Sequence, residues 1–127
     1  MSDERGSVSI AVAAMMAAIV VLALGAADVA RVFTVASRAQ TAADAAALAA
    51  AQELALPGGE ATPTEIAGSY ALRNGAVLGS CACEPGTFEA EVDVKVLVGA
   101  LTLGADDLAV VASARAVVDL PSVDIRG

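Results

Sequence analysis

The first half of the chain carries a long apolar pattern. Residues 6–27 include no charged side chain, and residues 8–27 would span about 30 Å as an α-helix, the thickness of a bilayer's hydrocarbon core. Helix-favouring residues, mostly alanine, continue to Leu56, where a Pro-Gly-Gly sequence stops the pattern. We therefore predict a short leader of residues 1–6 and one helix over residues 7–56, transmembrane over about 8–27.

Beyond the transmembrane part, the helical pattern has two different sides. We expect the polar side to be solvated; it comprises Asp28, Arg31, Arg38, Thr41, Asp44 and Gln52. The other side is lined by small side chains, namely Ala39, Ala43, Ala46 and Ala50. Methyl groups bury too little area to hold a lone helix, but they allow close contact with a helix or a sheet. The alanine side is therefore expected to be covered.

The second half alternates between turn signals and short periodic segments. A cluster of breakers over residues 57–64 precedes a helix that we expect to begin at Pro63 and to end near Asn74 and Gly75. A strand is expected over residues 76–82, followed by a turn.

Two further segments alternate with the period of a strand. In residues 88–98 the apolar face is formed by Phe88, Val92, Val94, Val96 and Val98, and the polar face by Glu89, Glu91, Asp93 and Lys95. In residues 108–120 the corresponding inner face is formed by Val110, Ala112, Ala114, Ala116 and Val118. Because a three-stranded sheet with one apolar face must be covered, we predict an α+β fold in which a head of residues 57–127 packs on residues 28–56.

Composition narrows the classes of function. The net charge is −8, aromatic residues make up 2% of the chain and histidine is absent. A nucleic-acid partner would favour a basic patch with stacking aromatics, and most catalytic sites rely on histidine or on converging acids. We expect no nucleic-acid partner, no cofactor, no small-molecule substrate and no catalytic residue. Four acids that an enzyme could use give no reason to expect a shared cleft; they are Asp106, Asp107, Asp119 and Asp124.

The two cysteines, Cys81 and Cys83, lie two residues apart. No second pair completes a four-ligand zinc site, so no metal is expected. A disulfide and free thiols both remain open, because residues i and i+2 of an extended strand lie near the upper distance limit for bonding.

Three segments together resemble a known family: ERGSVSIAVAAMM, then Asp28, then RAQTAADAAALAAA. They are similar to the N-terminal region of TadE/TadG-like proteins, minor-pilin-like components of the bacterial tight-adherence (Flp) pilus machinery. The resemblance covers about Arg5 to Leu54. Its motif residues here are Asp28, Arg38, Gln40, Ala43, Asp44, Ala46 and Leu48.

The resemblance implies a pilin-like fold, a membrane location and a structural role without chemistry. It also implies a prepilin-peptidase cut between Gly6 and Ser7. The acidic residue that such pilins carry five places after the cut would fall at Ala11. Three readings stay open: a place at a filament tip, a subunit that stays in the membrane, or a chain that is not cleaved.

Small residues within the membrane segment indicate how it would contact partners. Ala11, Ala14, Ala18 and Gly25 follow a spacing that lets neighbouring helices approach closely in lipid. We expect the partners to be the membrane and other pilin-like or secretion-system subunits.

The sequence leaves more than one possibility for the side of the membrane on which the head lies and for the cleavage of the chain. One arginine, Arg5, precedes the apolar segment and two, Arg31 and Arg38, follow it, and this distribution of positive charge points weakly to a cytoplasmic head. The resemblance and the cysteines favour a head outside the cell membrane, either in a single-pass protein or in an extracellular filament. The alternative is a secreted binding domain released by signal peptidase near Ala27. A membrane-tethered enzyme is a third class.

Overall fold

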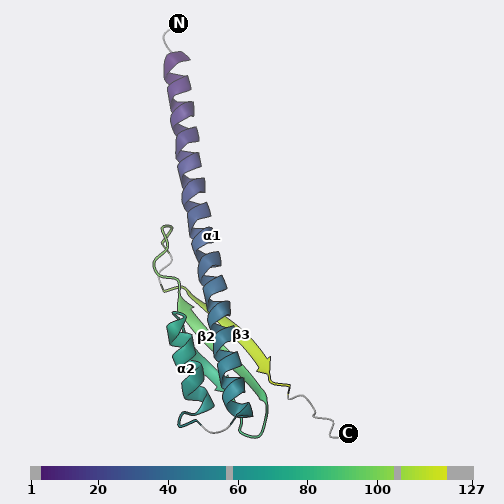
Figure 1. The fold of residues 1–127 in the computed structure, drawn as a ribbon. Helices are drawn as coiled ribbons and strands as arrows, with labels where there is room; N and C mark the ends of the chain where they lie inside the picture. The colour runs from purple at the N-terminus through teal and green to yellow at the C-terminus, as the bar shows by residue number, and fades with distance from the viewer. Residues whose placement is uncertain (1–3, 57–58, 105–106, 120–127) are drawn as a thin grey trace.

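The computed structural model describes residues 4–56, 59–104 and 107–119. Two helices and three strands follow one another in the order α1 (Glu4–Ala55), α2 (Pro63–Arg73), β1 (Val77–Ala82), β2 (Glu89–Leu97) and β3 (Ala109–Val117). Figure 1 shows α1 as a long rod, with the other elements gathered around the half nearer its C-terminal end. The predicted α+β arrangement of a long helix, a short helix and a small antiparallel sheet is confirmed.

Helix α1 runs through 52 residues without interruption, which corresponds to about 78 Å at the rise of an α-helix. Alanine and other straight-chain or apolar residues sustain it, and it contains no proline. Its N-terminal part stands clear of the head (Figure 1). Among the described residues, the packing that stabilises the C-terminal half of α1 is therefore lacking around its N-terminal half.

Helix α2 begins with a complete capping box. Thr62 Oγ1 accepts the backbone N–H of Glu65 at 3.3 Å, and the Glu65 carboxylate accepts the backbone N–H of Thr62 at 2.8 Å. Pro63 occupies the first turn, where its missing N–H costs nothing. The helix ends at Arg73, Asn74 is its C-cap, and Gly75 follows with a φ of 76° in the left-handed region. These local signals explain why both ends lie where the sequence predicted them.

The three strands form one antiparallel sheet in the order β1-β2-β3. Along β2 the inward residues Ala90, Val92, Val94 and Val96 are buried. Phe88, predicted to lie on the same apolar face, precedes the strand and is 45% exposed. The alternation correctly assigns the faces within β2, but it does not locate the residue at which the strand begins.

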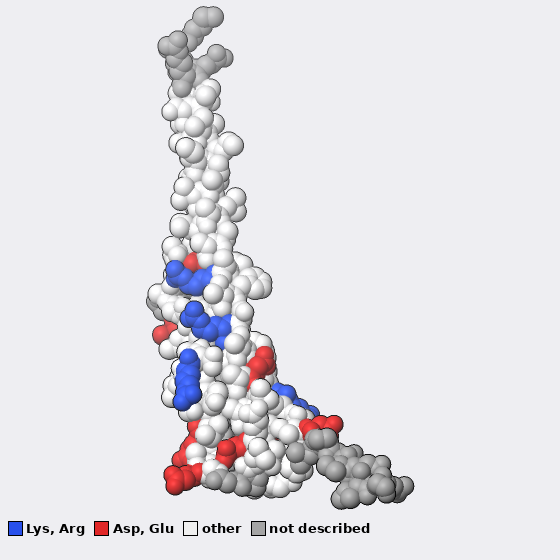
Figure 2. Space-filling view, viewed as in Figure 1, with Lys and Arg blue, Asp and Glu red and all other residues white. Residues whose placement is uncertain are grey.

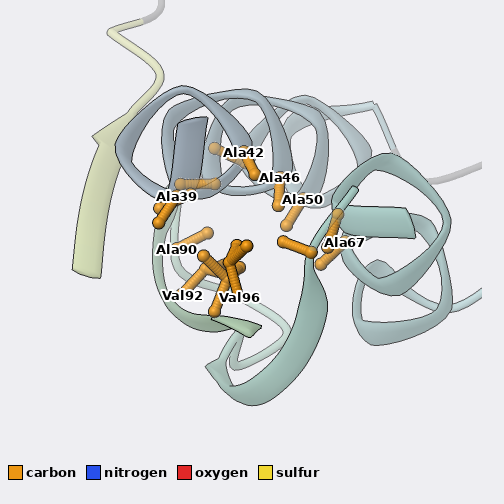
Figure 3. Close-up of a cluster of buried hydrophobic side chains, with 14 of the residues drawn as sticks. Ala39, Ala42, Ala46, Ala50, Ala67, Ala90, Val92 and Val96 are labelled. Carbon is orange, nitrogen blue, oxygen red and sulfur yellow. The ribbon is translucent and has the colours of Figure 1, made fainter. Parts of the chain in front are cut away.

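The core lies between the C-terminal half of α1 and the sheet, and α2 closes its side (Figure 3). Ala39, Ala43, Ala46 and Ala50 are fully buried, which confirms that the alanine side of the helix is covered. The inward residues of β3 and Val118, which directly follows it, are partly buried against the same cluster; those of β3 are Val110, Ala112, Ala114 and Ala116. The core is therefore built largely from alanine and valine.

Candidate assembly interface

The N-terminal part of α1 offers a long exposed apolar surface. Every residue from Gly6 to Leu24 is exposed, and the most apolar window of the helix has none of its residues buried inside the fold. The large side chains involved include Val8, Ile10, Met15, Ile19 and Leu22. Figure 2 shows this shaft without charge, whereas acidic and basic residues begin at the level of the head. The helix is long and apolar enough to cross a membrane.

The four small residues expected to mediate helix packing differ in their surroundings. Ala11, Ala14 and Ala18 are exposed on the free shaft, so their role in packing stays a prediction. Gly25 is only partly exposed. A Cβ built on it would lie 3.9 Å from Leu103 Cδ1. Gly25 therefore faces a loop of its own head.

Asp28 corrects the expectation that the whole polar side of the helix is solvated. Its side chain is 7% exposed. Its two carboxylate oxygens accept the backbone N–H groups of Thr102 and Leu103, each at 3.1 Å. An ionised carboxylate that accepts two N–H bonds is well satisfied away from bulk water. Asp28 thus fastens the loop between β2 and β3 to α1.

The same contacts shift the protonation of Asp28. The backbone N–H of Thr102 is the main cause that holds the pKa of Asp28 below its ordinary value of 3.8, although partial burial opposes the shift. The N–H of Leu103 and the positive charge of Arg31 act in the same direction as Thr102. Asp28 is accordingly ionised at neutral pH.

Two further polar side chains of α1 reach the sheet. Arg31 Nη1 donates to the carbonyl oxygen of Ala100 at 3.0 Å. Gln40 Nε2 donates to Asp44 Oδ1 at 3.0 Å and lies 3.4 Å from the carbonyl oxygen of Ser113 in β3. Together with Asp28, these residues fix the helix to the β2–β3 loop and to the middle of β3.

The remaining motif residues divide between the core and the surface. Ala43 and Ala46 are fully buried, and Leu48 is 52% exposed. Arg38 and Asp44 are exposed as well. The motif therefore combines residues that pack the head on the helix with residues that stay on its surface.

Several polar side chains on the outer face of the sheet are paired with one another. Asp93 accepts hydrogen bonds from Ser80 Oγ at 2.7 Å and from Ser113 Oγ, so that it links all three strands. The hydroxyl of Ser113, with that of Ser80 second, holds the pKa of Asp93 below its usual value. Arg115 Nη2 lies 2.6 Å from Glu89 Oε1. This face has the character of a solvated strand surface.

Cys81 and Cys83 are joined in a disulfide, with 5.4 Å between their Cα atoms. Two residues of a fully extended strand would be about 6.6 Å apart. Strand β1 ends at Ala82, so the backbone is free to shorten there. Both side chains rest against the core cluster.

The remaining candidate sites are the cleavage site, a metal site and the four C-terminal acids. Gly6 and Ser7 lie in the exposed first turns of α1, and their cleavage stays a prediction. Among the described residues, no group of three or more histidine, cysteine or acidic side chains is placed to hold a metal ion. Asp107 and Asp119 are exposed, whereas Asp106 and Asp124 lie outside the described residues.

Sequence reasoning missed the β2–β3 loop as the partner of Asp28. The one available signal was the position of Asp28 as the first charge after the uncharged run of residues 6–27. An acid at that place needs a partner close to the membrane boundary. Nothing local in the sequence indicates that Thr102 and Leu103 supply it.

Comparison with protein families agrees with the resemblance seen in the sequence. Residues 6–53 match the family described as "Putative Flp pilus-assembly TadE/G-like". The match confirms a TadE/G-like identification for this segment, which is most of α1 and includes Asp28 and the alanine-rich motif. Searches of curated proteins and of solved structures found no match.

Proposed function

We propose that this protein is a non-enzymatic structural or assembly subunit of a bacterial Flp-type pilus or a related secretion machinery. The observation that carries the proposal is the free half of α1: an apolar shaft of membrane-spanning length, unburied by its own head, within a segment that matches a pilus-assembly family. An exposed apolar surface of this size needs lipid or another protein to cover it.

In this proposal residues 8–27 anchor the chain in the membrane in a single pass. During assembly, other pilin-like helices replace the lipid around the shaft. Alanine and valine side chains are as compatible with lipid tails as with neighbouring helices. The free-energy difference between the lipid-covered and the helix-covered shaft is therefore small, and it depends on how closely the helices pack. The face with Ala11, Ala14 and Ala18 is the contact surface.

The head is placed outside the cell membrane. The Cys81–Cys83 disulfide supports this side, because disulfides persist in oxidising compartments. The α1 segment beyond Ala27 then acts as the spine of an extracellular fold. Cleavage between Gly6 and Ser7 and entry into a filament belong to the same proposal.

Site-specific photocrosslinking in cells tests the helix contact. A photoreactive residue at Ala14 or Ala18 is expected to crosslink to another pilin-like subunit. The same residue at Met16, which lies on roughly the opposite side of the helix, is the matched control and is expected to crosslink much less. Equal protein crosslinking from both sides, or none from either, would contradict the proposed packing face.

A further inference from the structure

Apolar side chains from two distant segments meet at the junction between the membrane segment and the head. Leu101 and Leu103 come from the β2–β3 loop, and Val29, Val32 and Phe33 come from α1. Leu103 is 62% exposed and Phe33 is 72% exposed. Leu101 lies with the three α1 residues around one apolar hollow. We call these five residues the collar.

The depth of the collar follows from its distance along α1. A Cβ on Gly25 would touch Leu103 at 3.9 Å, and Gly25 lies about 3 Å before the end of the segment proposed to span the membrane. Leu103 is therefore level with the boundary of the hydrocarbon core. Phe33 is about 9 Å beyond Ala27 along the helix axis. Because helical side chains lean toward the N-terminus and the headgroup zone adds about 5–8 Å on each side of the hydrocarbon core, the ring of Phe33 falls within the headgroup zone.

Three backbone N–H groups of the loop are hydrogen-bonded, as a position close to the hydrocarbon core requires. The N–H groups of Thr102 and Leu103 both donate to Asp28, and Gly104 N–H donates to the carbonyl oxygen of Leu101 at 3.2 Å. Backbone groups near hydrocarbon must be paired, because no water is present there to satisfy them. The turn presents Leu103 outward while its backbone donors are satisfied by α1.

We propose that residues 101–104 of the β2–β3 loop form a second membrane contact, in which Leu103 and the rest of the collar insert into the acyl–headgroup boundary of the leaflet from which α1 emerges. The inference rests on the proposed membrane anchoring of α1. The occupant of the collar is lipid, because the apolar side chains of the collar adjoin the uncharged shaft, and the nearby charges of Asp28 and Arg31 are hydrogen-bonded to the loop. The contact fixes the height and tilt of the head above the membrane.

Tryptophan fluorescence tests the insertion, because the chain contains no tryptophan. Three single-tryptophan variants of the full chain are compared in phosphatidylcholine vesicles, with and without bromine on the acyl chains. They are Leu103→Trp, Leu22→Trp in the shaft and Val117→Trp at the far end of β3 (Figure 1). The three positions are similarly exposed, at 62%, 73% and 63%.

The expected result is blue-shifted emission and bromine quenching at positions 103 and 22, with neither effect at position 117. Quenching at 22 but not at 103 would overturn the loop insertion and leave the anchor intact. A blue shift at 103 without quenching would show that protein covers the loop, and would also overturn it. Absence of quenching at 22 would instead refute the membrane anchor itself.

Discussion

Asp28 connects α1 to the head close to the point where the exposed part of the helix ends. It follows directly on the uncharged segment, and its carboxylate holds the backbone of a loop 74 residues away in sequence. Gly25, about one turn earlier, faces Leu103 of the same loop, and a Cβ at this position would lie 3.9 Å from Leu103 Cδ1, an ordinary van der Waals contact. Asp28 and Gly25 therefore both lie at the junction between the helix and the head.

The pH dependence of the loop contact follows from the lowered pKa of Asp28. A carboxyl group whose pKa is lower in the folded state contributes stability above its unfolded pKa, and this stability is lost as the pH falls through the folded pKa. We therefore expect hydrogen exchange at the amides of Thr102 and Leu103 to accelerate as the pH drops below about 4, after correction for the intrinsic exchange rate.

The variant Asp28→Asn isolates this effect. An amide has only one acceptor oxygen, so one of the two N–H groups loses its partner at every pH. The variant is expected to show faster corrected exchange at neutral pH and little additional change below pH 4. If the variant and the parent chain responded to acid in the same way, the assignment of the effect to Asp28 would be wrong.

Among the elements, α2 and the alanine face of α1 depend on different interactions. Helix α2 depends on a local cap between Thr62 and Glu65. The C-terminal half of α1 depends on close contact, since Ala39, Ala46 and Ala50 have no exposed surface. Substitutions at the two places are therefore expected to act by different mechanisms.

Removal of the cap should destabilise the head modestly. Thr62→Ala deletes the hydroxyl that accepts the N–H of Glu65, and loss of such a cap typically costs about 1 kcal/mol. Thermal unfolding of the full chain in detergent micelles, followed by circular dichroism, measures the change. Thr64→Ala, exposed in the first turn of the same helix, is the control and should stay within about 0.5 kcal/mol.

Overpacking of the alanine face should cost more. Ala46→Leu adds three carbon atoms where the side chain is fully buried, and insertions of this kind destabilise by about 1–3 kcal/mol. The matched control is Ala30→Leu on the exposed side of the same helix. Equal unfolding temperatures for the two variants would mean that the helix and the sheet are not in close contact.

The elements were predictable because their signals are local. Alternation marked β2 and β3, the Thr-Pro-Thr-Glu sequence marked the start of α2, and alanine periodicity marked the buried side of α1. The partner of Asp28 was not predictable, because a hydrogen bond between a helix and a distant loop leaves no periodic pattern. Phe88 was misplaced for a related reason, since alternation does not reveal where a strand begins.

At the scale of the whole molecule, one continuous helix serves two environments. Its N-terminal half is apolar on all sides and uncovered by the head, while its C-terminal half is the spine of a small α+β fold (Figure 1). A rigid connection between the two halves would transmit forces and orientation from the membrane segment to the head. Asp28, Arg31 and the loop that they hold brace the helix at the point where the halves meet.

Hydrogen exchange along α1, measured by mass spectrometry on the full chain in lipid vesicles, tests this continuity most directly. The account predicts slow exchange from Val8 to Leu54 without a break, with lipid protecting the first part and the sheet protecting the second. A rapidly exchanging stretch between Gly25 and Gln40 would contradict the single rod. Exchange over residues 8–27 as fast as in an exposed loop would contradict the membrane segment.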